Sequence, residues 1–193
     1  MHEGVSEPLD LSHASSTTVA LVADTHGQLD ARVARLAVRC DAVAHAGDVG
    51  ARAVLDALAA RSAPVLAVRG NNDVPAGWPD GEPALAETLP AVARLLLPGG
   101  EVVLVHGDAW PAARRHRGLR TRFAEARAVV YGHSHRLTVD ESVLPWLLNP
   151  GAAGRSRTFG GPSCLLLRAT HRRWEVTAHR FPLPARPLLR RAS

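Results

Sequence analysis

Residues 129–135 read Val-Val-Tyr-Gly-His-Ser-His, a short β-branched run that ends at Gly132 and continues into two histidines. The run predicts a buried strand. Alternate side chains of extended backbone point the same way, so we expect His133 and His135 to face one spot beyond the strand end. Two neutral imidazoles that converge there suit one transition metal ion, or two neighbouring ones. The alternative is a surface loop that happens to contain histidines, and the choice depends on whether the rest of the chain supplies matching ligands.

The chain has 193 residues, a length that fits one domain with a full hydrophobic core. No apolar run approaches the length of a membrane span. Residues 1–16 lack the basic start and apolar core of a secretory signal. Cys40 and Cys164 lie in apolar stretches and are too few for a disulfide framework. We therefore expect a cytoplasmic protein with two buried thiols and no membrane association.

The net charge is +5 at neutral pH, and all 23 basic residues are Arg. A basic balance can serve nucleic acid or other anionic partners. Ala, Gly and Pro are also abundant, however, which favours a composition bias as the reason for the missing Lys. Only 4% of the residues are aromatic, which leaves few platforms for base stacking, so nucleic acid is not the favoured substrate.

The first third of the chain alternates between apolar runs and amphipathic segments. We predict strands at residues 17–23, 42–46 and 64–68, and helices at about residues 29–40 and at 51–61. This alternation indicates parallel strands joined by helical crossovers. A polar cluster follows each strand, and in open α/β sheets such clusters lie together beyond the carboxyl ends of the strands.

The rest of the chain is expected to be mainly β-structure. Residues 74–90 hold four of the 14 Pro residues and are expected to form a long loop. Residues 92–97 and 101–105 are typical of a β-hairpin that turns at 98–100, and the Arg-rich residues 111–127 are expected to be helical. Short apolar segments then suggest a second sheet with antiparallel pairing: residues 137–139, 144–148, 164–167 and 174–178.

We divide the chain into three parts. Residues 1–16 are expected to be a flexible leader, residues 17–181 a single domain, and residues 182–193 a Pro- and Arg-rich tail. No internal repeat and no domain linker is evident in the sequence.

Seven residues at or near predicted strand ends carry side chains that bind transition metals: Asp24, His26, Asp48, Asn71, His106, His133 and His135. Together they offer three hard oxygen ligands and four imidazoles, with no thiolate, a mixture that suits Mn, Fe, Zn, Co or Ni. Seven donors are too many for one catalytic ion and suit two. A two-metal site needs a bridging carboxylate, whose two oxygens can bind two cations at once.

Five motifs follow one another in an order that resembles the calcineurin-like metallophosphoesterases: Asp24-x-His26, Gly47-Asp48, Gly70-Asn71-x-Asp73, His106-Gly107 and Gly132-His133-x-His135. The likeness covers about residues 17–180. It is greatest to the small single-domain bacterial phosphodiesterases, a branch that is similar to retromer's phosphoesterase-like subunit and shares the Asn-Pro-Gly turn at residues 149–151. The resemblance implies an α/β fold, a four-layer αββα sandwich of two mixed β-sheets flanked by helices.

The resemblance also divides the ligands into two groups and a bridge: Asp24, His26 and His135 for one ion, Asn71, His106 and His133 for another, and Asp48 for both. It implies a phosphodiesterase that uses two divalent transition-metal ions, with Mn expected first. A hydroxide shared between the ions would attack phosphorus in line. Two alternatives of the same fold stay open. One is a non-catalytic metal-binding scaffold, as in retromer, and the other is a phosphomonoesterase or protein phosphatase.

Two positions depart from the family pattern. Many members carry a His after Gly-Asn that protonates the leaving group, but here Asn72 stands in that place. Asn cannot donate a proton but can hydrogen-bond a phosphoryl oxygen, so we expect activated aryl diesters to react well and alkyl monoesters poorly. Asp108 replaces the second His of the common His-Gly-His. The catalytic candidates are Asp48, Asn72 and Asp73, although Asp73 is also expected to orient its own loop.

Four arginines near the predicted site, together with Asn72, are candidates for contact with the substrate phosphate, because guanidinium binds phosphate bidentately. Arg114 and Arg115 belong to a basic run that also fits a solvated helix face, and Arg155 and Arg157 follow the 149–151 turn. The expected partner is a small phosphodiester, and self-association into a homo-oligomer stays open.

Overall fold

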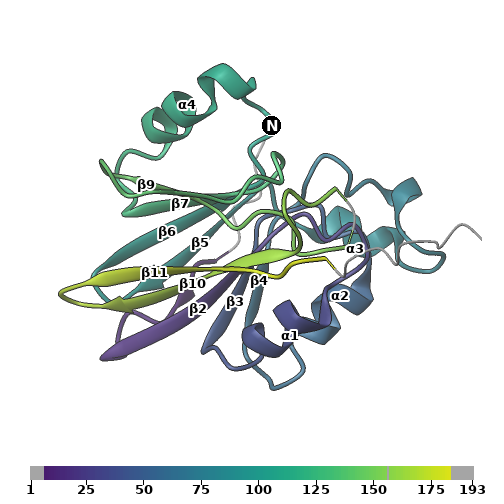
Figure 1. The fold of residues 1–193 in the computed structure, drawn as a ribbon, viewed down its shortest axis with the longest axis horizontal. Coiled ribbons are helices and arrows are strands. Elements are labelled where there is room, and N and C mark those ends of the chain that lie inside the picture. Colours follow the sequence, from purple (N-terminus) through teal and green to yellow (C-terminus); the bar gives the residue numbers. More distant parts are fainter. Residues whose placement is uncertain (1–6, 156, 184–193) are drawn as a thin grey trace, which may run out of the picture.

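A computed structural model describes residues 7–155 and 157–183 of the chain. Two β-sheets face each other, with α1 (Ala31–Ala37) and α2 (Arg52–Leu58) outside one sheet and α4 (Arg115–Arg122) outside the other (Figure 1). The expected four-layer αββα sandwich with mixed sheets is confirmed. None of the described helices is long and apolar enough to cross a membrane.

The first sheet has five strands in the order β11-β10-β2-β3-β4. Their bounds are β2 (Ser16–Val22), β3 (Ala42–His45), β4 (Val65–Ala67), β10 (Ser163–Thr170) and β11 (Trp174–Arg180). β2, β3 and β4 are parallel, as the alternating pattern predicted, and β10 pairs antiparallel with both β2 and β11. The C-terminal hairpin therefore completes the sheet that the N-terminal third begins.

The second sheet has six strands in the order β1-β5-β6-β7-β9-β8. Their bounds are β1 (Leu9–Asp10), β5 (Val92–Leu97), β6 (Gly100–Val105), β7 (Ala128–Tyr131), β8 (Thr138–Asp140) and β9 (Trp146–Asn149). β5 and β6 form the predicted hairpin, and β7 lies parallel to both β6 and β9. A separate antiparallel sheet built from the late strands was therefore a wrong prediction, because these strands divide between the two sheets.

Hydrophobic layers cover both faces of both sheets. In β2, Val19 and Leu21 face the space between the sheets, whereas Ala20 and Val22 pack toward the outer helices. The outer face of the second sheet packs against Leu119 of α4. Burial on both faces explains why β2 is a continuous apolar run and does not alternate with polar residues.

Three expectations need correction. The leader prediction is wrong from Leu9 onward, because β1 pairs with β5 and Ser16 already belongs to β2. The segment predicted as a long loop contains η1 (Pro75–Gly77) and α3 (Pro83–Thr88). Pro suits the first turn of a helix, where its missing N–H loses no hydrogen bond.

The predicted helices are confirmed but shorter than expected, with a 3-10 turn, η2 (Ala112–Arg114), before α4. Residues 1–6 of the predicted leader and 184–193 of the predicted tail lie outside the described residues.

The carboxyl ends of the parallel strands meet at one rim. In the first sheet, the Asp24 amide donates to Gly47 O (3.0 Å), and in the second the Gly132 amide donates to His106 O (3.1 Å). Between the two sheets, the His133 amide donates to Asp24 Oδ1 (3.1 Å). These bonds place the polar clusters of both sheets side by side.

Candidate metal centre

The seven predicted ligands lie in one cluster at this rim. Four of them offer ligand atoms that all lie within 4.8 Å of one another: Asp24, His26, Asp48 and His135. Beside them, Asn71 Oδ1 lies 3.1 Å from His106 Nε2 and 2.8 Å from His133 Nδ1. Asp48 Oδ2 joins the two halves, at 3.7 Å from His26 Nε2 and 3.4 Å from His106 Nε2. The two groups that the resemblance implies, and the residue expected to bridge them, are thus neighbours in space.

Left-handed backbone is concentrated in this cluster. Five of the seven residues have positive φ angles: Asp24 (54°), His26 (47°), Asp48 (56°), His133 (65°) and His135 (55°). Among the described residues only Ser62 and Arg157 share this conformation without being glycine. A non-glycine residue in this region costs about 1–3 kcal/mol, and such strain gathers at functional sites. The strand ends are therefore shaped to turn these side chains inward at a cost in stability.

Two glycines allow the loops to approach closely. A Cβ on Gly70 would collide with the Asp48 carboxylate, and a Cβ on Gly47 would lie 2.6 Å from His106 Nδ1. The Gly-Asp and Gly-Asn pairs of the sequence motifs therefore have a steric reason, since the glycine makes room for a neighbouring ligand.

Two histidines are oriented by backbone carbonyls. His106 Nδ1 donates to Ala46 O (2.9 Å), and His135 Nδ1 donates to Arg157 O (3.0 Å). In each ring Nε2 then faces the cluster, and in the neutral ring its lone pair is the donor that a metal ligand needs.

Burial and the neighbouring carboxylates set the pKa values of the four histidines in the cluster. Burial lowers the pKa of His26, His133 and His135, which favours the neutral rings that metals bind. Burial acts the same way on His106, but the adjacent Asp48 carboxylate outweighs it and raises the pKa of His106 to about 8.

The two carboxylates differ in their hydrogen bonds. Burial favours protonation of Asp48, but hydrogen bonds from His106 and Asn72 outweigh it and hold the pKa of Asp48 below its usual range. Asp24 is fully buried, its Oδ2 has no hydrogen-bond partner among the described residues, and burial raises its pKa to about 7. An unpartnered buried carboxylate oxygen beside the imidazoles of His26 and His135, whose pKa values are lowered, is a donor set that suits a cation. The residues present therefore fit a site for divalent transition-metal ions.

Asp24→Asn should stabilise the metal-free protein. The folded-state pKa of about 7 exceeds the ordinary 3.8, so the folded protein binds this proton more tightly and its stability falls as pH rises between these values. At pH 8 with a chelator, the midpoint of thermal unfolding of the variant should be about 5–10 °C above that of the wild type. This shift corresponds to a gain on the order of 2–4 kcal/mol in the free energy of unfolding. The variant should gain less than the wild type from added Mn²⁺. Thermal unfolding at pH 5 and pH 8, with EDTA or Mn²⁺, measures both effects, and equal midpoints at pH 8 in EDTA would contradict the expectation.

Asp73 is not a catalytic residue, contrary to one of the sequence-based predictions. Its carboxylate is buried and accepts from the backbone amides of Val49 (3.1 Å), Gly50 (2.9 Å) and Gly70 (2.9 Å), and from Trp78 Nε1 (3.1 Å). These bonds use both oxygens and tie the loops after β3 and β4 together. The expected role in orienting its own loop is confirmed.

Asn72 lies at the exposed edge of the cluster. Its backbone amide donates to Asp48 Oδ1 (2.9 Å), and its side-chain Nδ2 donates to Asp48 Oδ2 (2.7 Å). The side chain thus touches the residue expected to bridge two ions, in the place where many family members are expected to carry a proton-donating His.

Arg115 is a structural residue, so its prediction as a phosphate contact is wrong. The side chain is buried, with Nε donating to Gly107 O (2.8 Å) and Nη2 donating to Trp110 O (3.2 Å). It therefore braces the loop that follows His106. Arg114 is exposed and lines a hollow along α4 that includes Trp110 and none of the seven predicted ligands.

Arg157 lies beside the cluster. Its Nη2 is 2.7 Å from His26 Nε2, close enough for the guanidinium to reach a phosphate bound at the ligands. Arg155 is exposed, and no polar contact links it to the cluster within residues 7–155 and 157–183.

Two polar residues that brace the ligand loops were missed as site residues. Asn149 Nδ2 donates to Gly132 O (2.8 Å) and to Ser134 Oγ (3.1 Å), which holds the loop between β7 and β8. Thr25 Oγ1 lies 2.9 Å from Nε2 of the buried His45 and stands between two ligands in the sequence. Two features of the sequence could have indicated these roles: the Asn-Pro-Gly turn that contains Asn149, and the position of Thr25 between two predicted ligands.

Comparison with known proteins agrees with this architecture. A family model described as a calcineurin-like phosphoesterase superfamily domain matches residues 18–172. Vacuolar protein sorting 29 from Cryptosporidium parvum is 19% identical, with a TM-score of 0.67 over 88% of this chain and 100% of that one. Vps29 from Entamoeba histolytica complexed with Zn²⁺ is 17% identical (TM-score 0.64; 86% and 98% covered). YfcE, a phosphoesterase from E. coli, is 19% identical (TM-score 0.54; 79% and 91% covered). The search of curated proteins yields no match.

Proposed function

Since the chain belongs to the calcineurin-like phosphoesterase superfamily, we propose that it is a metal-dependent phosphodiesterase that acts on a small phosphodiester. The observation that carries this proposal is the seven-residue donor cluster, with its unpartnered buried Asp24 oxygen. When bound, two divalent ions, Mn²⁺ foremost, supply positive charge that acidifies water for in-line attack and stabilises the phosphoryl oxygens. Two free, buried cysteines among the described residues fit the reducing cytoplasm in which we place the enzyme.

The residues of the cluster and its rim have different roles in the proposed reaction. Asp48 reaches both halves of the cluster. His106 and His135 are each fixed by a hydrogen bond to a backbone carbonyl, so their Nε2 atoms face the cluster. Arg157 stands at the rim, where a guanidinium can pair with the oxygens of a substrate phosphate. The histidines and carboxylates thus hold the cations, and the arginine orients the anion.

The preference for an activated leaving group follows from Asn72. An amide cannot protonate a leaving group, so the reaction depends on a leaving group that departs without a proton. Activated aryl diesters meet that condition, whereas alkyl monoesters do not.

Metal removal and replacement test the proposal. Protein stripped with a chelator should be inactive, and Mn²⁺, Co²⁺, Ni²⁺ or Zn²⁺, restored one at a time, should return hydrolysis of bis(p-nitrophenyl) phosphate with at least one ion. Hydrolysis of ethyl phosphate should stay about 10²-fold or more slower. Lack of turnover with every ion, or equal rates on both substrates, would overturn the proposal.

A metal-binding scaffold is the second candidate. It is favoured by one observation, the occupation of Asp48 by the Asn72 amide where a proton-donating His is expected. Such a scaffold would gain thermal stability from Mn²⁺ or Zn²⁺ and yet show no turnover on any phosphate ester. The two functions are thus separated by comparing unfolding and hydrolysis in the same metal titration.

A further inference from the structure

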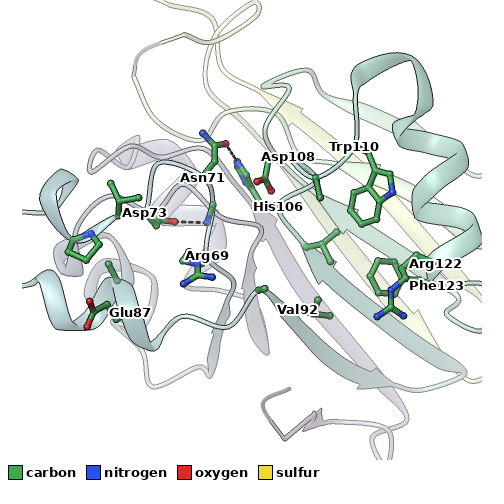
Figure 2. A pocket seen from close by; sticks show the side chains of 18 residues that line it. Arg69, Asn71, Asp73, Glu87, Val92, His106, Asp108, Trp110, Arg122 and Phe123 are labelled. Atoms are coloured by element: carbon green, nitrogen blue, oxygen red, sulfur yellow. Dashed lines mark hydrogen bonds between the residues drawn. The ribbon is translucent and has the colours of Figure 1, made fainter. Parts of the chain in front are cut away.

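A cavity adjoins the metal cluster. It has a volume of about 410 Å³ and shares Asn71 and His106 with the cluster (Figure 2). This volume lies within the range of about 300–1,000 Å³ that is typical of small-molecule sites. A phosphate at the cluster would therefore have one ester substituent beside this cavity.

The end of the cavity away from the cluster is aromatic. Trp110 and Phe123 line it, with ring centroids 6.5 Å apart in an edge-to-face arrangement (Figure 2). Gly118 of α4 leaves room for the indole, since a Cβ there would collide with the Trp110 ring. Glycine is a poor helix former, so its presence inside a short helix fits a requirement to seat Trp110. The indole is thus held in one position and half-buried, as a stacking surface requires.

Polar groups complete the lining. Exposed Arg122 offers hydrogen-bond donors beside the aromatic pair, with its guanidinium carbon 5.4 Å from the Phe123 ring centroid, and exposed Asp108 offers an acceptor near His106 (Figure 2). Arg69 and Glu87 lie at the opposite end of the cavity, and Val92 and Val105 add apolar surface (Figure 2). The carboxylates of Glu87 and Asp108 accompany the two arginines in the lining, so the cavity does not favour a second phosphate. The donors of Arg122 and the acceptor of Asp108, on the Trp110 side of the cavity, instead suit a neutral ring that carries both kinds of hydrogen-bonding group.

We propose that this cavity binds a nucleoside substituent of the phosphodiester, with the base against Trp110 and the phosphate at the metal cluster. The inference rests on the proposed function for the position of the phosphate. It names the substrate class as small nucleotide esters, which need only one stacking surface, whereas a nucleic-acid strand would need a series of them.

Two substrates with the same leaving group test the proposal in the metal-loaded protein. Thymidine 5′-(p-nitrophenyl phosphate) should exceed methyl p-nitrophenyl phosphate in kcat/KM by about 10-fold or more, since one stacked base is typically worth about 5–150-fold. Trp110→Ala should lose most of this preference, mainly through KM, and Trp110→Phe should retain part of it. Arg172→Ala, at the exposed turn between β10 and β11 and away from the lining of this cavity, is the control and should change nothing.

A binding measurement separates this inference from the proposed function. Thymidine 5′-monophosphate should quench the part of the fluorescence that Trp110→Phe removes, and methyl phosphate should not. The quench is measurable even if no ester is hydrolysed, in which case the proposed function fails and the cavity assignment stands. If Trp110→Ala does not fold, Phe123→Leu serves in its place. Hydrolysis without any nucleoside preference, or the absence of the quench, would overturn the inference.

Discussion

Asp48→Asn should lower metal-dependent hydrolysis by about 10³-fold or more, because the loss of one charged bridging ligand removes several kcal/mol of stabilisation from the transition state. Asp48 Oδ2 is the atom that reaches both halves of the cluster, at 3.7 Å from His26 Nε2 and 3.4 Å from His106 Nε2. An amide has the same shape but offers only one oxygen, so it can serve one ion at a time. Metal content by mass spectrometry should fall from two ions toward one.

The variant should stay folded. The Asn72 backbone amide can donate to the new side-chain oxygen as it does to Asp48 Oδ1. Asp56→Asn is the matched control, because Asp56 is exposed on α2 and pairs with Arg52 only at 3.7 Å. Wild-type turnover in Asp48→Asn, with its metal content unchanged, would show that Asp48 does not bridge.

The sequence predicted the parts of this molecule that depend on local pattern. β2 and β7 are apolar runs that are followed by candidate ligands. Both the strands and the meeting of their ends were foreseeable because parallel strands share one carboxyl edge. The partners of β10 were not foreseeable, since an isolated apolar run carries no mark of the strand beside which it lies. The short β1 was missed for the same reason, because its two residues form a strand only by pairing with β5.

The candidate site likewise has features that the sequence could predict and features that it could not. The gathering of the seven candidate ligands could be predicted because few side chains bind transition metals, and Gly-Asp and Gly-Asn pairs mark turns with close approaches. The burial of Arg115 could not be predicted, because Arg side chains are usually exposed. This one is buried because it donates to a carbonyl of the loop after His106, which only the structure reveals. The low aromatic content argued against stacking surfaces, but it did not reveal that Trp110 and Phe123 would lie together beside the cluster.

Asn72→His should extend the activity to alkyl phosphates, with a gain of about 10²-fold or more in kcat/KM on ethyl phosphate and little change on p-nitrophenyl esters. Asn72 Nδ2 lies 2.7 Å from Asp48 Oδ2, so a ring at this position would stand beside the atoms that meet the substrate. The residue is exposed, so the larger side chain meets little steric resistance and the midpoint of thermal unfolding should move only slightly. The gain should be confined to poor leaving groups, because only these need a proton as they depart.

Asn72→Ala is the control that separates proton donation from the removal of the amide. Alanine frees Asp48 Oδ2 from its hydrogen bond without supplying an acid, so it should not raise turnover of ethyl phosphate. If both variants gain equally, the Asn72 amide restrains the cluster by occupying Asp48. If the His variant gains nothing on either substrate, the position does not face the leaving group, and the substrate preference has to arise elsewhere in the site.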